Sequence, residues 1–166
     1  MGKNLYLLRH AQTLEKQHDE SDADRELTPV GIQNATRMGI NLKNKNIYPD
    51  MLISSPVVRT QATSEIVAEQ IGYDLSKIHY NIEIYNASIR TLLKAVNNFK
   101  DEWNSTLLIG HNPAITYLAE YLSGEAIGDM STCGLVSISF DLNSWSMISE
   151  NNGSFKWYEY PDLLNF

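Results

Sequence analysis

The sequence predicts an α/β protein in which helices cover both faces of a mostly parallel central sheet, a three-layer α/β/α arrangement with an antiparallel C-terminal edge. Two observations support this prediction. Through residue 122, short apolar runs alternate with longer segments whose apolar residues recur at helical spacing. After residue 133, the apolar runs follow one another and are separated by turn residues. This order is typical of a parallel sheet that antiparallel strands extend at one edge.

The strands of the parallel part are predicted from short apolar runs. Residues 4–9 form the first of these strands and residues 106–110 the last, and both are expected to be buried because their apolar side chains are continuous. Residues 50–54 form a second strand, and residues 77–80 form a weaker third one.

Four helices are predicted between or after these strands. Thr28 is a typical N-cap and Pro29 a typical first helical residue, so the first helix begins there. Pro56 begins the second helix, which continues to about Gln70, and Pro113 begins the fourth. The apolar face is expected to contain Val58, Ala62, Ile66 and Val67 in the second helix, Ile89, Leu92, Leu93, Val96 and Phe99 in the third, and Ile115, Leu118, Ala119 and Leu122 in the fourth.

The C-terminal part is predicted to form three further strands, at residues 134–140, 145–149 and 155–160. The segment Asn151–Gly153 separates the last two, and its Asn-Gly pair favours a tight hairpin. The chain contains no internal repeat, linker or low-complexity tract. We therefore expect one domain that comprises residues 1–166.

The composition excludes several classes of function. Thirteen basic against 20 acidic residues give a formal charge of −7, which argues against nucleic-acid binding, because that function requires a basic face. No window approaches the ~20 apolar residues of a membrane span, and nothing resembles a signal peptide, so a cytoplasmic location without membrane contact is expected. The single cysteine, Cys133, excludes an internal disulfide.

Basic and imidazole side chains recur at the carboxyl ends of the predicted parallel strands. Arg9 and His10 end the first strand, His111 follows the last, and Arg59 lies in the first turn of the second helix. These positions face the same edge of a parallel sheet, so the side chains are expected to share one pocket. Helix starts such as the one after Asn112 would add free N–H groups. The sequence therefore predicts a site for a phosphate or sulfate ion.

Four sequence blocks, in this order, resemble those of the histidine phosphatase superfamily, which includes the phosphoglycerate mutases. The blocks are Leu8–Thr13, Leu27–Gly31, Ser54–Thr60 and Ile109–Pro113. The chain length and the short middle region resemble the small protein phosphohistidine phosphatases of the SixA type. One departure is Ala11, which stands where the family usually has glycine.

The resemblance implies a phosphatase that uses neither a metal nor a cofactor. The imidazole of His10 would attack phosphorus and form a phosphohistidine intermediate, which water then hydrolyses. Arg9, Arg59 and His111 would bind the phosphoryl oxygens and neutralise their charge, which is the main catalytic task in phosphoryl transfer. Asn112 is assigned to phosphate binding as well.

The resemblance also implies a position for the general acid. Glu83 falls where the family tends to carry its acid, after the third strand, and is therefore the predicted proton donor to the leaving group. If Glu83 is instead a surface carboxylate, the acid is expected among Glu15, Asp19 and Glu20 in the polar loop of residues 14–26, which could border the pocket.

Three functional hypotheses follow. The leading one is a phosphatase for phosphohistidine on a protein, because the absence of long insertions between Arg59 and His111 favours an open, shallow site. The second is a phosphatase of small sugar or nucleotide phosphates. The third is a phosphate-binding module without turnover. In each case the expected partner is a phosphorylated protein or a small phosphate ester.

Overall fold

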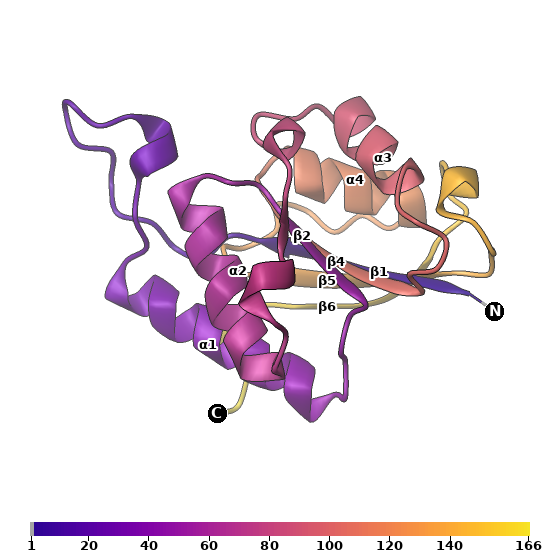
Figure 1. Cartoon of the computed structure of the whole chain (residues 1–166), viewed down its shortest axis with the longest axis horizontal. Coiled ribbons are helices and arrows are strands. Elements are labelled where there is room, and N and C mark those ends of the chain that lie inside the picture. The colour runs from indigo at the N-terminus through magenta and orange to yellow at the C-terminus, as the bar shows by residue number, and fades with distance from the viewer. Residues whose placement is uncertain (1) are drawn as a thin grey trace.

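A mixed sheet runs through the middle of the computed structural model, which describes residues 2–166 (Figure 1). In the described residues the sheet has six strands in the order β3-β2-β4-β1-β5-β6. The strands are β1 (Lys3–Arg9), β2 (Met51–Ser54), β3 (His79–Tyr80), β4 (Ser105–Gly110), β5 (Leu135–Phe140) and β6 (Ser154–Glu159).

The strand directions confirm the fold class predicted from the sequence. The strands β3, β2, β4 and β1 are parallel to one another, whereas β5 is antiparallel to β1 and β6 is antiparallel to β5. The two C-terminal strands therefore form the expected antiparallel edge, next to β1.

Helices cover both faces of the sheet. They are α1 (Pro29–Asn44), α2 (Val58–Ile71), α3 (Ile89–Asn97) and α4 (Ala114–Ser123). Figure 1 shows α1 and α2 on one side of the strands and α3 and α4 on the other. The side chains of β1 alternate accordingly, because Leu7 belongs to the core under α3 and α4 and Leu8 to the core under α1 and α2. Within the described residues, no helix has the length and apolar character that crossing a membrane requires.

The start of α1 has the local structure that its sequence predicts. The Thr28 side chain accepts a hydrogen bond of 2.8 Å from the Gly31 N–H, and Pro29 is the first helical residue. This cap satisfies one of the backbone donors that a helix start leaves without an intrahelical partner. A further hydrogen bond of 3.0 Å, from the Thr28 N–H to the Gln12 carbonyl, ties the helix start to the segment that follows β1.

The buried face of α2 differs from the predicted one. Val67 is buried as predicted, whereas Val58, Ala62 and Ile66 are only half-buried, and the face against the sheet combines apolar residues with several polar ones. Its hydroxyl groups are satisfied by backbone carbonyls: Thr63 donates to Arg59 over 2.7 Å, and Thr60 donates to the Ser55 carbonyl over 2.7 Å. Because these bonds remove the cost of burying the hydroxyls, polar residues can pack inward beside the apolar ones, and the apolar row of Val58, Ala62 and Ile66 remains partly exposed.

The middle C-terminal run, residues 145–149, is not a strand, and that prediction was wrong. Residues Trp145–Met147 form a 3-10 turn, in which the Trp145 side chain is fully buried and its indole N–H donates to the Trp103 carbonyl over 2.8 Å. Burial of the indole in the core under α3 thus outweighed the β-forming composition. The connection from β5 to β6 is consequently a long loop, and the Asn-Gly pair does not form a tight hairpin.

Gly39 lies where α1 packs against α2. A Cβ atom added there would lie 2.7 Å from the Cβ of Gln70 and 3.2 Å from the Cα of Val67. We expect Gly39→Ala to lower the free energy of unfolding by about 1–3 kcal/mol, because overpacking outweighs the better helix propensity of alanine. Urea unfolding measures this change. Gln33→Ala, on the exposed side of α1, is the control and should shift the free energy by less than about 0.5 kcal/mol. A stabilised Gly39→Ala protein would contradict the close helix contact.

Candidate active site

The register of two parallel strands brings the two histidines together. Arg9 on β1 lies opposite Gly110 on β4, so the next residues, His10 and His111, leave the sheet side by side. The His10 N–H donates to the Gly110 carbonyl over 3.1 Å, and the two imidazole ring centres are 5.5 Å apart. The sequence prediction that these side chains share one edge of the sheet agrees with this geometry.

These strand ends coincide with the point where the chain changes faces of the sheet. The helix that follows β1 covers one face, and the helix that follows β4 covers the other. Between two such strands the connections diverge and leave a crevice at the carboxyl ends, which is the usual ligand position in open α/β sheets.

The orientation of His10 is set by its neighbour. Its Nδ1 atom lies 2.8 Å from the Ala11 carbonyl oxygen, which can only accept a hydrogen bond, so Nδ1 carries the proton of the neutral ring. Its Nε2 atom is then an unprotonated nitrogen. The Ala11 N–H is itself held by the Thr63 hydroxyl over 3.0 Å. Ala11 does not have a positive φ angle, so the position does not require the glycine that is usual in the family.

His111 is held by a residue that follows a third strand. Ser55 comes directly after β2, and its N–H donates to the Ile109 carbonyl on β4 over 3.1 Å. The Ser55 hydroxyl lies 2.8 Å from Nε2 of His111. The other ring nitrogen of His111, Nδ1, is buried and has no hydrogen-bond partner in the described part of the chain.

Burial keeps both imidazoles neutral. Burial lowers the pKa of His10 to about 4, and the nearby charges of Arg59 and Arg9 act in the same direction, against the hydrogen bond to Ala11. Burial also lowers the pKa of His111 to about 3, and the charge of Arg59, together with that of His10 whenever His10 is protonated, acts in the same direction. At neutral pH the site of the unliganded protein therefore contains uncharged rings between cationic guanidinium groups.

The two arginines are held through part of their guanidinium groups. Arg59 is buried and donates to the Asp22 carbonyl over 2.8 Å and to the Asp22 carboxylate over 3.0 Å. Arg9 donates to the Met130 carbonyl over 2.8 Å, and burial lowers its pKa. Within the described residues, Nε of both arginines is buried without a hydrogen-bond partner. Each arginine thus retains donor capacity.

Asp22 is a cluster residue that the sequence analysis did not assign to the site. It lies in the polar loop of residues 14–26, and its carboxylate accepts a hydrogen bond of 2.6 Å from the Tyr85 hydroxyl in addition to the Arg59 bond. The Tyr85 bond is the largest cause that lowers the pKa of Asp22 to about 2, and Arg59 contributes as well. The loop therefore borders the cluster, as predicted.

Sequence reasoning missed Asp22, Ser55 and Tyr85 as members of the cluster. A signal for Ser55 existed, because the parallel register that places His111 after β4 places Ser55 after β2 at the same edge. No comparable signal existed for Asp22 and Tyr85, which lie far apart in the sequence and meet only because their loops fold over the strand ends.

The structure does not bring Glu83 into this cluster. Glu83 is exposed in the short turn Ile82–Ile84 and lines a separate cavity of about 250 Å³ together with His79 and Asn98. Asn112 lies closer, but both polar atoms of its side chain have partners: it donates to the Met130 carbonyl over 3.1 Å and accepts from Thr116 over 2.6 Å.

The lowered pKa values of the two histidines can be tested by NMR. Because a histidine in an unfolded chain titrates at about pH 6.5, the unfolded state takes up these protons first, and the free energy of unfolding should fall as the pH drops below about 6.5. In the folded protein the signals of His10 and His111 should remain those of neutral rings until the pH approaches about 4 and about 3. The substitutions His10→Gln and His111→Gln assign the signals. Titration of either ring near pH 6.5 would contradict the burial argument.

The fold of the chain is similar to that of known structures. One is the protein histidine phosphatase SixA complexed with tungstate, with 24% sequence identity, a TM-score of 0.84, and coverage of 98% of this chain and 99% of that one. Another is a candidate phosphohistidine phosphatase SixA from Agrobacterium tumefaciens, with 25% identity, a TM-score of 0.81, and coverage of 96% and 99% of the two chains.

Sequence comparison finds a related phosphatase and a matching family model. The serine/threonine-protein phosphatase Pgam5 of Drosophila ananassae, a mitochondrial protein, is 25% identical over 184 residues, a match that covers 94% of this chain and 58% of that protein. The match thus spans less than two thirds of that relative. The family model of the histidine phosphatase superfamily, branch 1, matches residues 5–87, which is half of the chain. The chain therefore belongs to the histidine phosphatase superfamily and is a histidine-nucleophile phosphatase of the SixA type.

Proposed function

We propose that this phosphatase removes the phosphoryl group from phosphohistidine on a protein, with His10 as the nucleophile. The observation that carries the proposal is the charge state of the groups that form the cluster with the two imidazoles. The cluster contains a neutral nucleophile and cations, and its one hydrogen-bonded carboxyl group, that of Asp22, is held ionised by Tyr85 and Arg59. Such a site suits a leaving group that requires no proton from the enzyme.

Phosphohistidine has such a leaving group. An alkoxide is a poor leaving group and must be protonated as its bond to phosphorus breaks, a task for a general acid. A phosphorylated imidazole whose other nitrogen already carries a proton departs as a neutral ring. The separation of Glu83 from the cluster therefore favours phosphohistidine over alkyl esters.

The reaction proceeds in two displacements. In the first, Nε2 of His10 forms a bond to phosphorus while the bond from phosphorus to the substrate nitrogen breaks, and the electron pair of that bond returns to the substrate ring. In the second, a water oxygen attacks phosphorus, the bond to Nε2 breaks, and the proton lost by water passes to the phosphate or to solvent. The Ala11 carbonyl keeps Nδ1 protonated throughout, so Nε2 remains the reacting atom.

Arg9, Arg59 and His111 are the groups that act on the phosphoryl oxygens, because the His111 ring centre lies 5.5 Å from that of His10 and the charges of both arginines are felt at His10. The free Nε groups of the two arginines and Nδ1 of His111 are donors or potential donors for an oxyanion. Asp22 and Ser55 act through these residues: Asp22 positions the Arg59 guanidinium, and Ser55 positions the His111 ring. SixA, whose fold is similar to that of this chain, forms a complex with tungstate, a phosphate-like oxyanion, and this supports an oxyanion site in this protein.

A small polar phosphate ester is the second candidate substrate, because a polar cavity of about 450 Å³ adjoins Arg9. Gln12, Asn34, Thr132 and Asp162 are among its lining residues. Their amide, hydroxyl and carboxyl groups could bind the hydroxyl groups of a sugar.

A substrate panel tests the proposed function. Wild-type protein should hydrolyse a phosphohistidine peptide with a kcat/KM that exceeds the value for glycerol phosphate by about 10²-fold or more, which is the typical contribution of a general acid. Nitrophenyl phosphate, whose leaving group needs little protonation, should lie between them. His10→Ala should abolish all three activities while circular dichroism remains that of the wild type. Equal rates on the peptide and on glycerol phosphate would favour the small-ester alternative.

Two carboxylate-to-amide substitutions compare a carboxylate inside the cluster with one outside it. Asp22→Asn should lower kcat/KM on phosphohistidine by about tenfold or more, because the Arg59 guanidinium loses a charged partner that orients it. Glu83→Gln makes the same chemical change outside the cluster and should leave the rate near that of the wild type. A steep loss of activity in Glu83→Gln would instead restore Glu83 as the general acid.

A further inference from the structure

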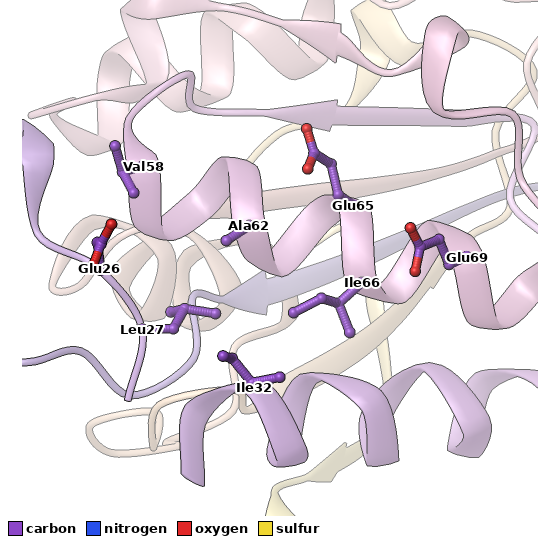
Figure 2. A pocket seen from close by; sticks show the side chains of 8 residues that line it. All are labelled: Glu26, Leu27, Ile32, Val58, Ala62, Glu65, Ile66 and Glu69. Carbon is purple, nitrogen blue, oxygen red and sulfur yellow. The ribbon is translucent and has the colours of Figure 1, made fainter. Parts of the chain in front are cut away.

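The apolar row of α2 lines a groove on the surface of the protein. We call it the α1–α2 groove; it has a volume of about 400 Å³ and is lined by Leu27, Ile32, Val58, Ala62 and Ile66 together with Glu26, Glu65 and Glu69. Figure 2 shows the apolar side chains of α1 and α2 facing one another across it, with the carboxylates of α2 along one side.

The apolar lining is unusual for a surface that faces water. The side chain of Ile32 is 49% exposed, and the apolar side chains of Val58 and Ile66 are only half-buried. The outer faces of helices in soluble proteins are normally polar, and contiguous exposed apolar surface marks places where another molecule binds. Ala62 and Ile66 pack against the core with one side, and the exposed parts of the apolar row remain available for such contact.

The rim of the groove carries unbalanced negative charge. Glu65 and Glu69 lie one turn apart on α2, and Glu26 lies near the other end of the groove. In the part of the chain that the structure describes, none of the three takes part in an ion pair, and the lining contains no lysine or arginine. The rim thus matches a cationic partner, not an anionic one.

The groove begins next to the catalytic cluster. Val58 directly precedes Arg59, and Glu26 and Leu27 end the loop that carries Asp22. From Val58 to Glu69 the groove follows α2 for about 16 Å, at 1.5 Å per residue. A segment in the groove would therefore lie beside a phosphorylated residue in the site.

We propose that the α1–α2 groove docks a basic, amphipathic segment of the phosphorylated protein substrate. Apolar side chains of the segment contact the floor of the groove, and lysine or arginine side chains pair with Glu65, Glu69 and Glu26. This is the usual way in which an amphipathic helix binds a groove. The proposal rests on the proposed function, because it assigns the groove to the protein that bears the phosphohistidine.

Binding can be measured without catalysis. The probe is a fluorescently labelled, unphosphorylated helical peptide of about four turns, with leucines on one face and lysines spaced four residues apart beside them. A second peptide replaces each lysine by glutamate. Glu65→Lys/Glu69→Lys protein should bind the lysine peptide about tenfold or more weakly than the wild type, because both ion pairs become repulsive.

A matched control removes the effect of net charge. Glu102→Lys/Glu150→Lys makes the same charge change at exposed positions outside the groove and should bind the lysine peptide as the wild type does. The lysine peptide should bind better than its glutamate counterpart, and raising the salt concentration should reduce that preference. Equal losses in the two double variants, or no binding of the lysine peptide to the wild type, would overturn the proposal.

Measurements of turnover distinguish a failure of the docking proposal from a failure of the proposed function. The substrates are the lysine peptide extended by a phosphohistidine, and phosphoimidazole, which is too small to reach the groove. In Glu65→Lys/Glu69→Lys protein, KM for the peptide should rise about tenfold with kcat unchanged, and kcat/KM for phosphoimidazole should stay at the wild-type value. An unchanged KM would disprove docking. If the wild type hydrolyses neither substrate, the proposed function fails, and docking is decided by the binding measurement alone.

Discussion

The parallel pairing of β1 with β4 is the constraint on which the site depends. Arg9 lies opposite Gly110 in this pairing, so His10 and His111 emerge at the same depth and on neighbouring strands. A shift of one residue would turn each side chain toward the opposite face of the sheet and separate the rings. Ser55 depends on the same register through β2, so three segments that are distant in the sequence converge on one edge.

Electrostatics at this edge oppose the charge of the whole chain. The protein carries a formal charge of −7, yet the buried guanidinium group of Arg59 and the half-buried one of Arg9 act on two neutral imidazoles. Burial and the neighbouring cations both favour the uncharged rings, which keeps a nitrogen lone pair available for attack. Asp22 balances part of the positive charge, because it accepts hydrogen bonds from Arg59. Arg9 donates instead to the Met130 carbonyl, so its charge is not paired with Asp22.

Features set by local or regular patterns could be predicted from the sequence. The cap of α1 at Thr28, the parallel strands and the convergence of His10 and His111 follow from spacing and topology. Features set by tertiary contacts could not. Trp145 forms a turn because the core under α3 accommodates its indole, and part of the buried face of α2 is polar because nearby carbonyls satisfy its hydroxyls. Asp22 and Tyr85 joined the cluster for a similar reason, since two loops meet above the strands.

The hydrogen bond between His10 and Ala11 also determines the regiochemistry of the proposed intermediate. With Nδ1 committed to the carbonyl of the next residue, the phosphoryl group is confined to the far nitrogen of the ring. The covalent intermediate is consequently a single isomer, whichever ring nitrogen of the substrate histidine carried the phosphoryl group. The acceptor of this hydrogen bond is a backbone carbonyl. A substitution of the side chain at residue 11 therefore alters which nitrogen is phosphorylated only if it moves that carbonyl.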